Sequence, residues 1–208
     1  MFTGIIENLA KVKDIVPEGG NKRLILFSSL ITELKVDQSL AHNGACLTVE
    51  KINLEDGTYE VVAVQETLQK TQLGSLRAGA IVNLERSLLA DSRIDGHFVQ
   101  GHIDMTSQLL EVYDANGSWL IRFSLPSETQ KYVVPKGSIA LNGVSLTVAA
   151  VDPESLVVAI VPFTAAHTNL SMLKRGDLVN VEFDMMGKYL VRYMDLRMNP
   201  KPDQPQQT

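Results

Sequence analysis

The 208-residue chain is 45% hydrophobic and 21% charged, and its formal net charge is −5 at pH 7. This balance is ordinary for a globular protein, and it excludes a disordered chain and a general nucleic-acid-binding surface, which needs a basic stripe. No apolar run is long enough to cross a bilayer, and the N-terminus lacks the pattern of an export signal. The single cysteine, Cys46, excludes an intrachain disulfide, so a cytoplasmic protein is expected. The four histidines show no zinc-site spacing, so no metal is expected.

Each half of the chain is predicted to consist of short strands separated by turns. Apolar, β-rich runs predict strands over residues 24–27, 59–64, 119–125 and 157–161. Gly-Gly, Asp-Gly, Asn-Gly and Pro-Lys-Gly sequences at residues 19–20, 56–57, 116–117 and 135–137 are turn signals. A short helical segment is expected in each half, over residues 30–34 and 127–132. Strands about ten residues apart favour a closed barrel or a sandwich.

The end of the chain has a different pattern. Residues 88–96 have no counterpart near the start and are expected to link two halves. Beyond residue 184, methionine, tyrosine and leucine side chains recur at helical spacing, from Met186 to Met194. This apolar stripe packs either on its own chain or, as we favour, against copies of the same helix in other subunits. The polar, proline-rich residues 199–208 are expected to be disordered.

The second half of the sequence repeats the first. Asn-Gly-Ala-Cys-Leu-Thr-Val at residues 43–49 returns as Asn-Gly-Val-Ser-Leu-Thr-Val at residues 142–148, a shift of 99 residues. Gly-Ile-Ile at residues 4–6 returns as Gly-His-Ile at residues 101–103, a shift of 97 residues. A unit of this length is a duplicated domain rather than a solenoid repeat. A duplicated domain can hold two copies of one ligand, so the differences between the copies are informative.

Two small polar side chains share a strand face in each half. Cys46 and Thr48 are two residues apart in the first copy, and Ser145 and Thr147 match them in the second. Such groups are often satisfied within a barrel wall, but their recurrence at matching points favours a role in binding a ligand. An Asn-Gly turn before each pair is by itself only a hairpin signal.

Two substitutions between the copies suggest chemistry. His102 stands where the first copy has Ile5, so the fold does not require a histidine there, and proton transfer near neutral pH is the obvious reason for it. Lys136 stands where the first copy has Asp37. The sequence has no phosphate-binding loop and no dinucleotide-binding fingerprint. A hydrolase built from Ser145, His102 and Asp184 would lack the nucleophile-elbow motif.

Together these motifs resemble the riboflavin synthase family, and the similarity extends to about residue 192. It is carried by Met-Phe-Thr-Gly-Ile-Ile at the N-terminus, residues 42–49, Glu-Thr-Leu at 66–68, Gly-His-Ile at 101–103, Lys-Gly at 136–137 and residues 143–148. The resemblance implies an all-β fold of two similar six-stranded Greek-key barrels and a C-terminal α-helix. The expected bounds are 1–97 for the N-terminal barrel, 98–185 for the C-terminal barrel, 186–198 for a trimerisation helix and 199–208 for the tail.

The resemblance also implies an activity. The family moves a four-carbon unit between two molecules of 6,7-dimethyl-8-ribityllumazine, which gives riboflavin and 5-amino-6-ribitylaminouracil, and it uses no cofactor or metal. Three chains assemble through their C-terminal helices, and each active site forms between the N-barrel of one subunit and the C-barrel of its neighbour. The sequence leaves open whether the trimer sits inside a lumazine synthase capsid.

Roles of individual residues follow from the same resemblance. His102 is expected to move a substrate proton; Ser145, Thr147, Cys46 and Thr48 are expected to hold the two substrates, with Cys46 as a transient nucleophile; Lys136 is expected to reach a ligand from the barrel edge. Phe163 and Ala165 are also implied substrate contacts, although both depart from the family pattern. The other implied substrate contacts are Phe2, Gly4, Ile5, Ile6, Ser39, Leu47, Val62, Ala63, Val64, Gln65, Glu66, Thr67, Gly101, Ile103, Leu146, Ile160, Val161, Pro162, Thr164 and Asp184.

Three other functions compete with this one. A relative that binds a lumazine or flavin as an optical antenna without turnover would have lost the polar residues that this chain keeps. A flavin reductase would need a dinucleotide-binding domain, which the sequence lacks. A nucleic-acid-binding barrel is opposed by the net charge of −5.

Overall fold

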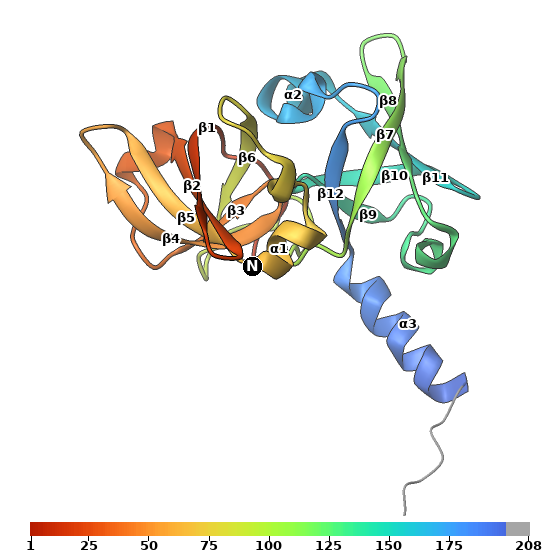
Figure 1. Ribbon diagram of the computed structural model, residues 1–208. Coiled ribbons are helices and arrows are strands. Elements are labelled where there is room, and N and C mark those ends of the chain that lie inside the picture. Colours follow the sequence, from red (N-terminus) through yellow and green to blue (C-terminus); the bar gives the residue numbers. More distant parts are fainter. Residues whose placement is uncertain (199–208) are drawn as a thin grey trace, which may run out of the picture.

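The structure, a computed structural model, describes residues 1–198; the predicted disordered tail lies outside the described residues. The described chain folds into two closed six-stranded antiparallel barrels followed by a helix (Figure 1). This confirms the expected fold class. No helix within residues 1–198 combines the length and the hydropathy that crossing a bilayer requires.

The N-terminal barrel closes in the order β1-β2-β5-β4-β3-β6, with β6 pairing back onto β1. Because β2 pairs with β5 rather than with the next strand along the chain, the connection is a Greek key. The strands are β1 (Asn8–Glu18), β2 (Asn21–Phe27), β3 (Ser39–His42), β4 (Ala45–Asn53), β5 (Thr58–Ala63) and β6 (Ile81–Arg86).

The C-terminal barrel repeats this topology in the order β10-β11-β8-β7-β12-β9. The strands expected over residues 119–125 and 157–161 are present as β8 and β11. The strands are β7 (Met105–Asp114), β8 (Trp119–Ser124), β9 (Ser138–Leu141), β10 (Val144–Asp152), β11 (Ser155–Ile160) and β12 (Leu178–Phe183).

Three short helices interrupt each barrel, where the sequence predicted one. The expected segments correspond to the 3-10 helices η1 (Ser29–Thr32) and η3 (Ser127–Tyr132). The sequence did not predict the other four. The N-cap residues of α1 and α2, Val64 and Val161, form no side-chain hydrogen bond, so no capping signal marks the start of either helix. The four helices are α1 (Gln65–Lys70), η2 (Gln72–Ser75), α2 (Pro162–His167) and η4 (Asn169–Met172).

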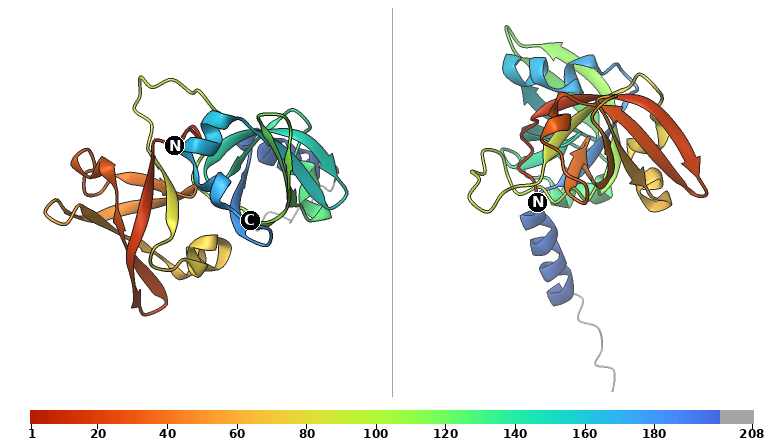
Figure 2. Two further views of the ribbon diagram at one scale, coloured as in Figure 1. Left: turned by 90° about the horizontal axis from the view of Figure 1, so that it is seen from above. Right: turned by 90° about the vertical axis from the view of Figure 1, so that its left-hand side faces the viewer.

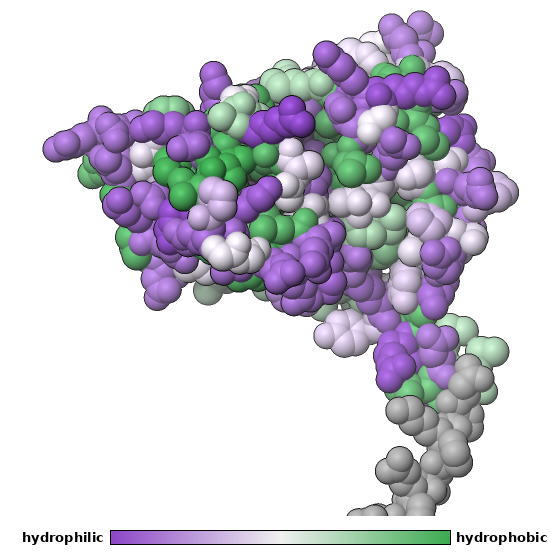
Figure 3. All heavy atoms as spheres, viewed as in Figure 1, coloured by the Kyte–Doolittle hydropathy of each residue, from purple (hydrophilic) through white to green (hydrophobic). Residues whose placement is uncertain are grey.

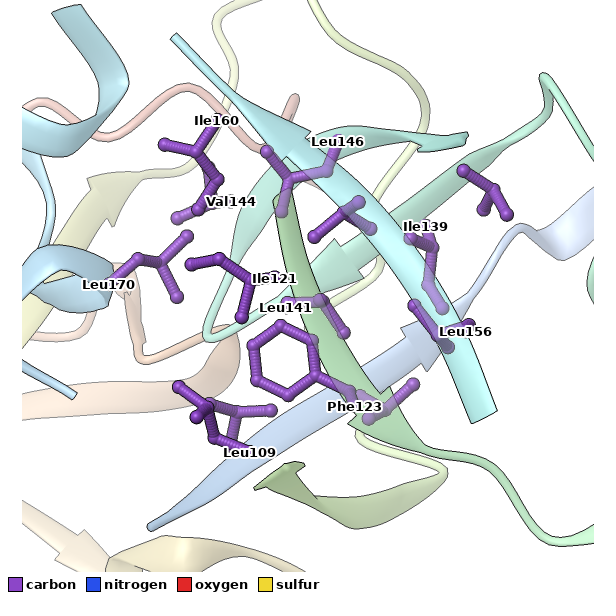
Figure 4. Packing of buried hydrophobic residues seen from close by; sticks show 14 of the residues in the cluster. Leu109, Ile121, Phe123, Ile139, Leu141, Val144, Leu146, Leu156, Ile160 and Leu170 are labelled. Carbon is purple, nitrogen blue, oxygen red and sulfur yellow. The ribbon is translucent and has the colours of Figure 1, made fainter. Parts of the chain in front are cut away.

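Both barrel interiors are filled by apolar side chains at alternate strand positions, as Figure 4 shows for the C-terminal barrel. Leu146 of β10 points into this core with Ile121 and Phe123 of β8. Since neighbouring residues on a strand face opposite ways, Ser145 and Thr147 lie on the outer wall. The same holds for Cys46 on β4, whose neighbour Leu47 is buried in the other core. A ligand held by these polar pairs would therefore lie outside each barrel.

A buried amide network joins the two barrels across an approximate twofold relation. The side-chain Nδ2 of Asn83 donates to the Asn142 carbonyl at 2.9 Å, and Nδ2 of Asn180 donates to the Asn43 carbonyl at 2.8 Å. All four residues are 0–1% exposed. Because the side-chain amides are buried and hydrogen-bonded, the network fixes how one barrel sits against the other.

The C-terminal helix α3 (Met185–Met198) extends from the end of β12 away from both barrels (Figures 1 and 2). Its predicted apolar stripe is more than half exposed at Met186, Tyr189, Leu190 and Tyr193, and hydrophobic residues are visible along it in Figure 3. Packing of the stripe against the chain's own barrels is thus not what the structure shows. An exposed apolar stripe of this kind marks an interaction surface.

Candidate functional site

The N-terminal segment lies on the C-terminal barrel, although it leads into β1. The Ser145 backbone N–H donates to the Gly4 carbonyl at 2.7 Å, and Ile6 packs against the core of the C-terminal barrel. Gly4 has φ +78°, and a Cβ there would stand 2.6 Å from Cβ of Ser145. Only glycine allows this approach. The view from above in Figure 2 shows the N-terminus where the two barrels meet.

The segment that leads into β7 makes the reciprocal crossing. The Cys46 backbone N–H donates to the Gly101 carbonyl at 2.9 Å, and Ile103 packs against the N-terminal core. Gly101 has φ +83°, and a Cβ there would stand 2.5 Å from Cβ of Cys46. Both glycines therefore serve contacts between the barrels; a further role in approaching a ligand stays a prediction.

Because of this crossing, His102 lies beside Cys46 and not beside Ser145. His102 and Cys46 line a pocket of about 230 Å³ on the outer wall of the N-terminal barrel, which we call the N-site. Six of the predicted site residues meet there with parts of α1. The lining residues are Ala45, Cys46, Glu66, Thr67, Lys70, Thr71, Gly101, His102 and Ile103.

One ion pair belongs to the N-site. Nζ of Lys70 donates to Oε1 of Glu66 at 2.7 Å, one helical turn away on α1. The hydrogen bond from Lys70 lowers the pKa of Glu66 below its usual range, and Glu66 raises the pKa of Lys70. Both side chains are exposed, so this pair adds little to stability. Its charges instead set the polarity that a ligand meets.

The matching position on the C-terminal barrel, which we call the C-site, centres on Ser145. Its side-chain partner is His97, whose Nδ1 lies 2.7 Å from Oγ of Ser145. The sequence did not point to this histidine. Burial lowers the pKa of His97, which favours the neutral imidazole, and its Nε2 is buried with no partner among the described residues. His97 follows the linker, which has no counterpart in the first half, so a comparison of the two copies gave no signal for it.

The helix α2 replaces the N-site ion pair by an aromatic pair. Phe163 occupies the place of Glu66, and its ring stacks on His167 with centroids 4.0 Å apart. Phe163 is 72% exposed, which leaves most of the ring free. Ala166 and His167 of α2 border a groove of about 510 Å³ together with Ile6 of the crossing N-terminal segment. The departure from the family pattern at Phe163 thus lies on the short helix after β11, at the position that Glu66 has beside the N-site.

The remaining predicted site residues are spread over several environments. Ser39 on β3 pairs with Thr48, and Lys136 lies exposed in a turn at φ +67°, which matches φ +72° at Asp37. Oδ1 of Asp184 accepts from the Met186 N–H at the start of α3. Phe2 is fully buried between the barrels rather than on the chain's surface.

The other predicted contacts divide by exposure. Five have side chains buried in the barrels and contribute no exposed outer surface: Leu47, Ala63, Leu146, Ile160 and Ala165. The others are exposed or half-buried, in the segment before β1, near the ends of strands or on the short helices: Ile5, Val62, Val64, Gln65, Val161, Pro162 and Thr164.

Two buried carboxylates also escaped sequence reasoning. Glu85 and Glu182 are the penultimate residues of β6 and β12, and each accepts hydrogen bonds from one crossing segment. The repeat itself contains both residues, in Asn-Leu-Glu at 83–85 and Asn-Val-Glu at 180–182. Their place in the repeat was therefore visible, but their partners, about 80 residues away, were not.

Comparison with known proteins defines the class. A lumazine-binding domain model matches twice, over residues 3–87 and 100–184, so each match covers one barrel. A riboflavin synthase from Actinobacillus pleuropneumoniae is 38% identical over 195 residues, which cover 93% of this chain and 90% of the relative. Riboflavin synthases from Bacillus amyloliquefaciens and Bacillus subtilis are 36% and 34% identical over 98% and 93% of this chain, and over 94% and 90% of the relatives. The protein is a transferase that carries a duplicated lumazine-binding domain. It belongs to the riboflavin synthase family.

Solved structures agree on the fold. LumP in complex with 6,7-dimethyl-8-(1'-D-ribityl)lumazine superposes with a TM-score of 0.79 at 20% identity, and covers 88% of this chain and 99% of LumP. LumP with riboflavin gives a TM-score of 0.81 at the same identity and coverage. At this identity the likeness concerns the arrangement of the barrels only.

Proposed function

We propose that this protein converts two molecules of 6,7-dimethyl-8-ribityllumazine into riboflavin and 5-amino-6-ribitylaminouracil. One substrate gives up a four-carbon unit and the other accepts it, so the atoms of the two products equal those of the two substrates and no oxidant is required. The observation that carries this proposal is the pair of sites, built alike on two copies of one domain but lined by different groups. Two copies of one binding domain suit two identical substrate molecules. The different side chains in the two sites suit the opposite roles of donor and acceptor.

Proton removal is assigned to the N-site. The substrate's ring methyl next to the ribityl-bearing nitrogen is acidic because its anion delocalises into the ring. His102 is the imidazole of this pocket, next to Cys46 and the crossing Gly101 backbone. General acid–base catalysis of this kind contributes roughly 10²–10⁴-fold. Cys46 and Thr48 hold the ligand, and Cys46 is in place to act as a transient nucleophile.

The partner substrate is assigned to the C-site. Ser145 and Thr147 hold it, and His97 shares a hydrogen bond with Ser145 that lets it pass or accept a proton there. Lys136 and the free face of Phe163 are available to the ligand from the barrel edge and from α2. Holding two rings in reacting geometry is worth up to roughly 7–11 kcal/mol of the barrier, which makes an organic cofactor unnecessary.

The two unlike sites meet between subunits in this proposal. The chain assembles as a homotrimer through the apolar stripe of α3, which is supported by its exposure and by its direction away from both barrels. The N-site of one chain then faces the C-site of its neighbour. A cytoplasmic location goes with this assignment, since Cys46 is free and the pathway enzymes it resembles act on soluble metabolites.

The test is direct. Purified protein is mixed with 6,7-dimethyl-8-ribityllumazine alone, and flavin absorbance is followed with product quantification. We expect one riboflavin and one pyrimidine product per two substrates consumed. Tight binding with altered fluorescence but no product would instead indicate a binding protein, an alternative that the structural likeness to ligand-bound LumP keeps in view. The riboflavin synthase relatives at 34–38% identity favour turnover.

A further inference from the structure

Two buried glutamates hold the crossing segments in matching ways. Glu182 accepts from three consecutive backbone N–H groups, those of Gln100 at 2.6 Å, Gly101 at 2.9 Å and His102 at 3.0 Å. Glu85 accepts from the N–H groups of Thr3 at 2.6 Å and Gly4 at 2.9 Å, and from the Thr3 hydroxyl at 2.8 Å. In both copies the carboxylate thus holds the segment that leads into the first strand of its own barrel. The hydrogen-bonded residues are about 80 positions apart in the sequence.

These carboxylates are expensive groups to bury. Both are under 5% exposed, and neither forms an ion pair with a Lys or Arg side chain of residues 1–198. Burial raises the pKa of each, while the N–H donors act in the opposite direction. A carboxylate without a direct ion pair is retained in a buried place where its hydrogen bonds satisfy it. That both copies keep it indicates that the position of the held segment matters.

The two held segments differ in what they carry. The segment fixed by Glu182 contains His102, whose own backbone N–H is one of the three donors. The segment fixed by Glu85 continues into Ile5, which has no group that can transfer a proton. The frame is therefore the same, but only one copy places an imidazole on it.

We propose that Glu182 is a positioning residue that sets His102 for proton transfer in the N-site, whereas Glu85 only holds the binding surface of the C-site. This proposal rests on the proposed function. Since the carboxylate grips the backbone at His102 itself, its loss lets the imidazole move relative to Cys46 and the ligand. A displacement near 1 Å costs up to roughly 100-fold in rate.

The experiment is a kinetic double-mutant cycle on the full chain. Wild type, E182Q, H102Q and E182Q/H102Q are compared, with E85Q as the matched control in the other copy. In E182Q one carboxylate oxygen becomes an amide NH₂ that faces backbone N–H donors. At least one hydrogen bond is therefore lost, while the size of the side chain is unchanged. We expect kcat to fall roughly 10- to 100-fold in E182Q with KM within about threefold. In E85Q the larger change is expected in KM.

The decisive outcome is the coupling between the two positions. If Glu182 acts through His102, E182Q costs little on the H102Q background, where the imidazole is already gone. An equal fold-loss on both backgrounds, or the same kcat loss in E85Q as in E182Q, would overturn the proposal and leave Glu182 a structural residue. Exchange of the substrate's methyl protons in D₂O, followed by NMR, gives the same comparison for the proton-transfer step alone.

Two other results, a variant that does not fold and a wild type without turnover, are distinguished from a failure of the proposal. If E182Q does not fold, E182D takes its place in the cycle, since it keeps the charge and withdraws the oxygens by one methylene. Coupling to H102Q is again the expected result, and additivity the contrary one. A wild-type protein that binds the lumazine without forming riboflavin would count against the proposed function rather than against the role of Glu182.

Discussion

The two outer-wall sites of this protein share one framework and differ in the chemical groups placed on it. In both, the crossing segment of one barrel lies against the strand after an Asn-Gly turn of the other, through a glycine at positive φ. The N-site has His102, Cys46 and a Glu66–Lys70 ion pair. The C-site has Ser145 bonded to His97, and α2 carries a stacked Phe163–His167 pair where α1 has the ion pair. Shared contacts between the copies are thus those the fold needs, and unshared groups are candidates for chemistry.

The largest effect is expected from removing α3, which would keep the N-site of one chain from meeting the C-site of another. A chain that ends at residue 184 keeps both barrels but lacks α3, the helix with the exposed apolar stripe. We expect monomers with almost no riboflavin formation, because one substrate in each of two separated sites cannot react. Analytical ultracentrifugation and activity measurements check this. A fully active monomeric truncation would contradict the assignment of the reaction to a shared site.

The next largest effect is expected at His102, the imidazole that replaces Ile5 of the first copy at the matching position. His102→Gln is expected to lower kcat by roughly 10²–10⁴-fold, because it removes the proton-transfer group and leaves the backbone contact with Glu182 in place. Ile5→Gln is the matched control at the same position of the other copy. Steady-state kinetics with both variants give the comparison. An unchanged rate in His102→Gln would show that another group moves the proton.

The barrel interiors offer a third contrast, in acid stability. His42 and Tyr59 are hydrogen-bonded to each other at 2.9 Å in the N-terminal core, where the C-terminal core has Leu141 and Leu156. Complete burial lowers the pKa of His42 to about 4. Below its unfolded value of 6.5 the unfolded chain binds more protons, so this contribution to stability is present above pH 6.5 and is lost as the pH falls toward 4.

Between pH 7 and pH 4 this histidine should therefore cost about 3 kcal/mol of stability. The raised pKa values of Glu85 and Glu182 act in the opposite direction, so the raw pH profile does not isolate His42. His42→Leu with Tyr59→Leu copies the C-terminal core and should flatten the profile in this window. Denaturant unfolding at several pH values measures the difference. A profile as steep as that of the wild type would rule out His42 as the cause.

The smallest effect exchanges the charged pair and the aromatic pair on the short helices. Phe163→Glu with His167→Lys gives α2 the ion pair of α1, and removes the ring that is available for stacking. A stacked ring is worth roughly 1–3 kcal/mol, so we expect ligand affinity to fall by about tenfold or more while stability changes little. Fluorescence titration with riboflavin measures this. Equal affinity in both proteins would mean that the Phe163 ring does not touch the ligand.

Much of the fold was predictable because its signals are local. Alternating apolar residues predicted β8, a β-rich apolar run predicted β11, and a repeat shifted by 97–99 residues predicted two similar domains. That each domain is a six-stranded barrel was implied by the resemblance to the riboflavin synthase family. The helical spacing after residue 184 gave α3. The short helices α1 and α2 were not predicted, and no capping residue marks where either begins.

The site was predictable only in part. The repeat pointed to Cys46, His102 and Ser145 as residues of interest, but not to which of them share a pocket. His97 could not be found by comparing the copies, because the linker before it exists only once. Glu182 was visible in the repeat, yet nothing local shows that its partners are the backbone groups of residues 100–102.

The sequence by itself determined that this chain is a duplicated, strand-rich protein with unlike groups at matching positions, because strand periodicity lies in neighbouring residues and a duplication repeats their order. The barrel form of each half was implied by the resemblance to a known family. Only the tertiary structure decided that each leading segment crosses to the other barrel, so that His102 stands with Cys46 and His97 with Ser145. The reason is physical: the crossing depends on glycines that admit close backbone contact and on two buried carboxylates that hold it. All of these act between residues tens of positions apart, where no local pattern reaches.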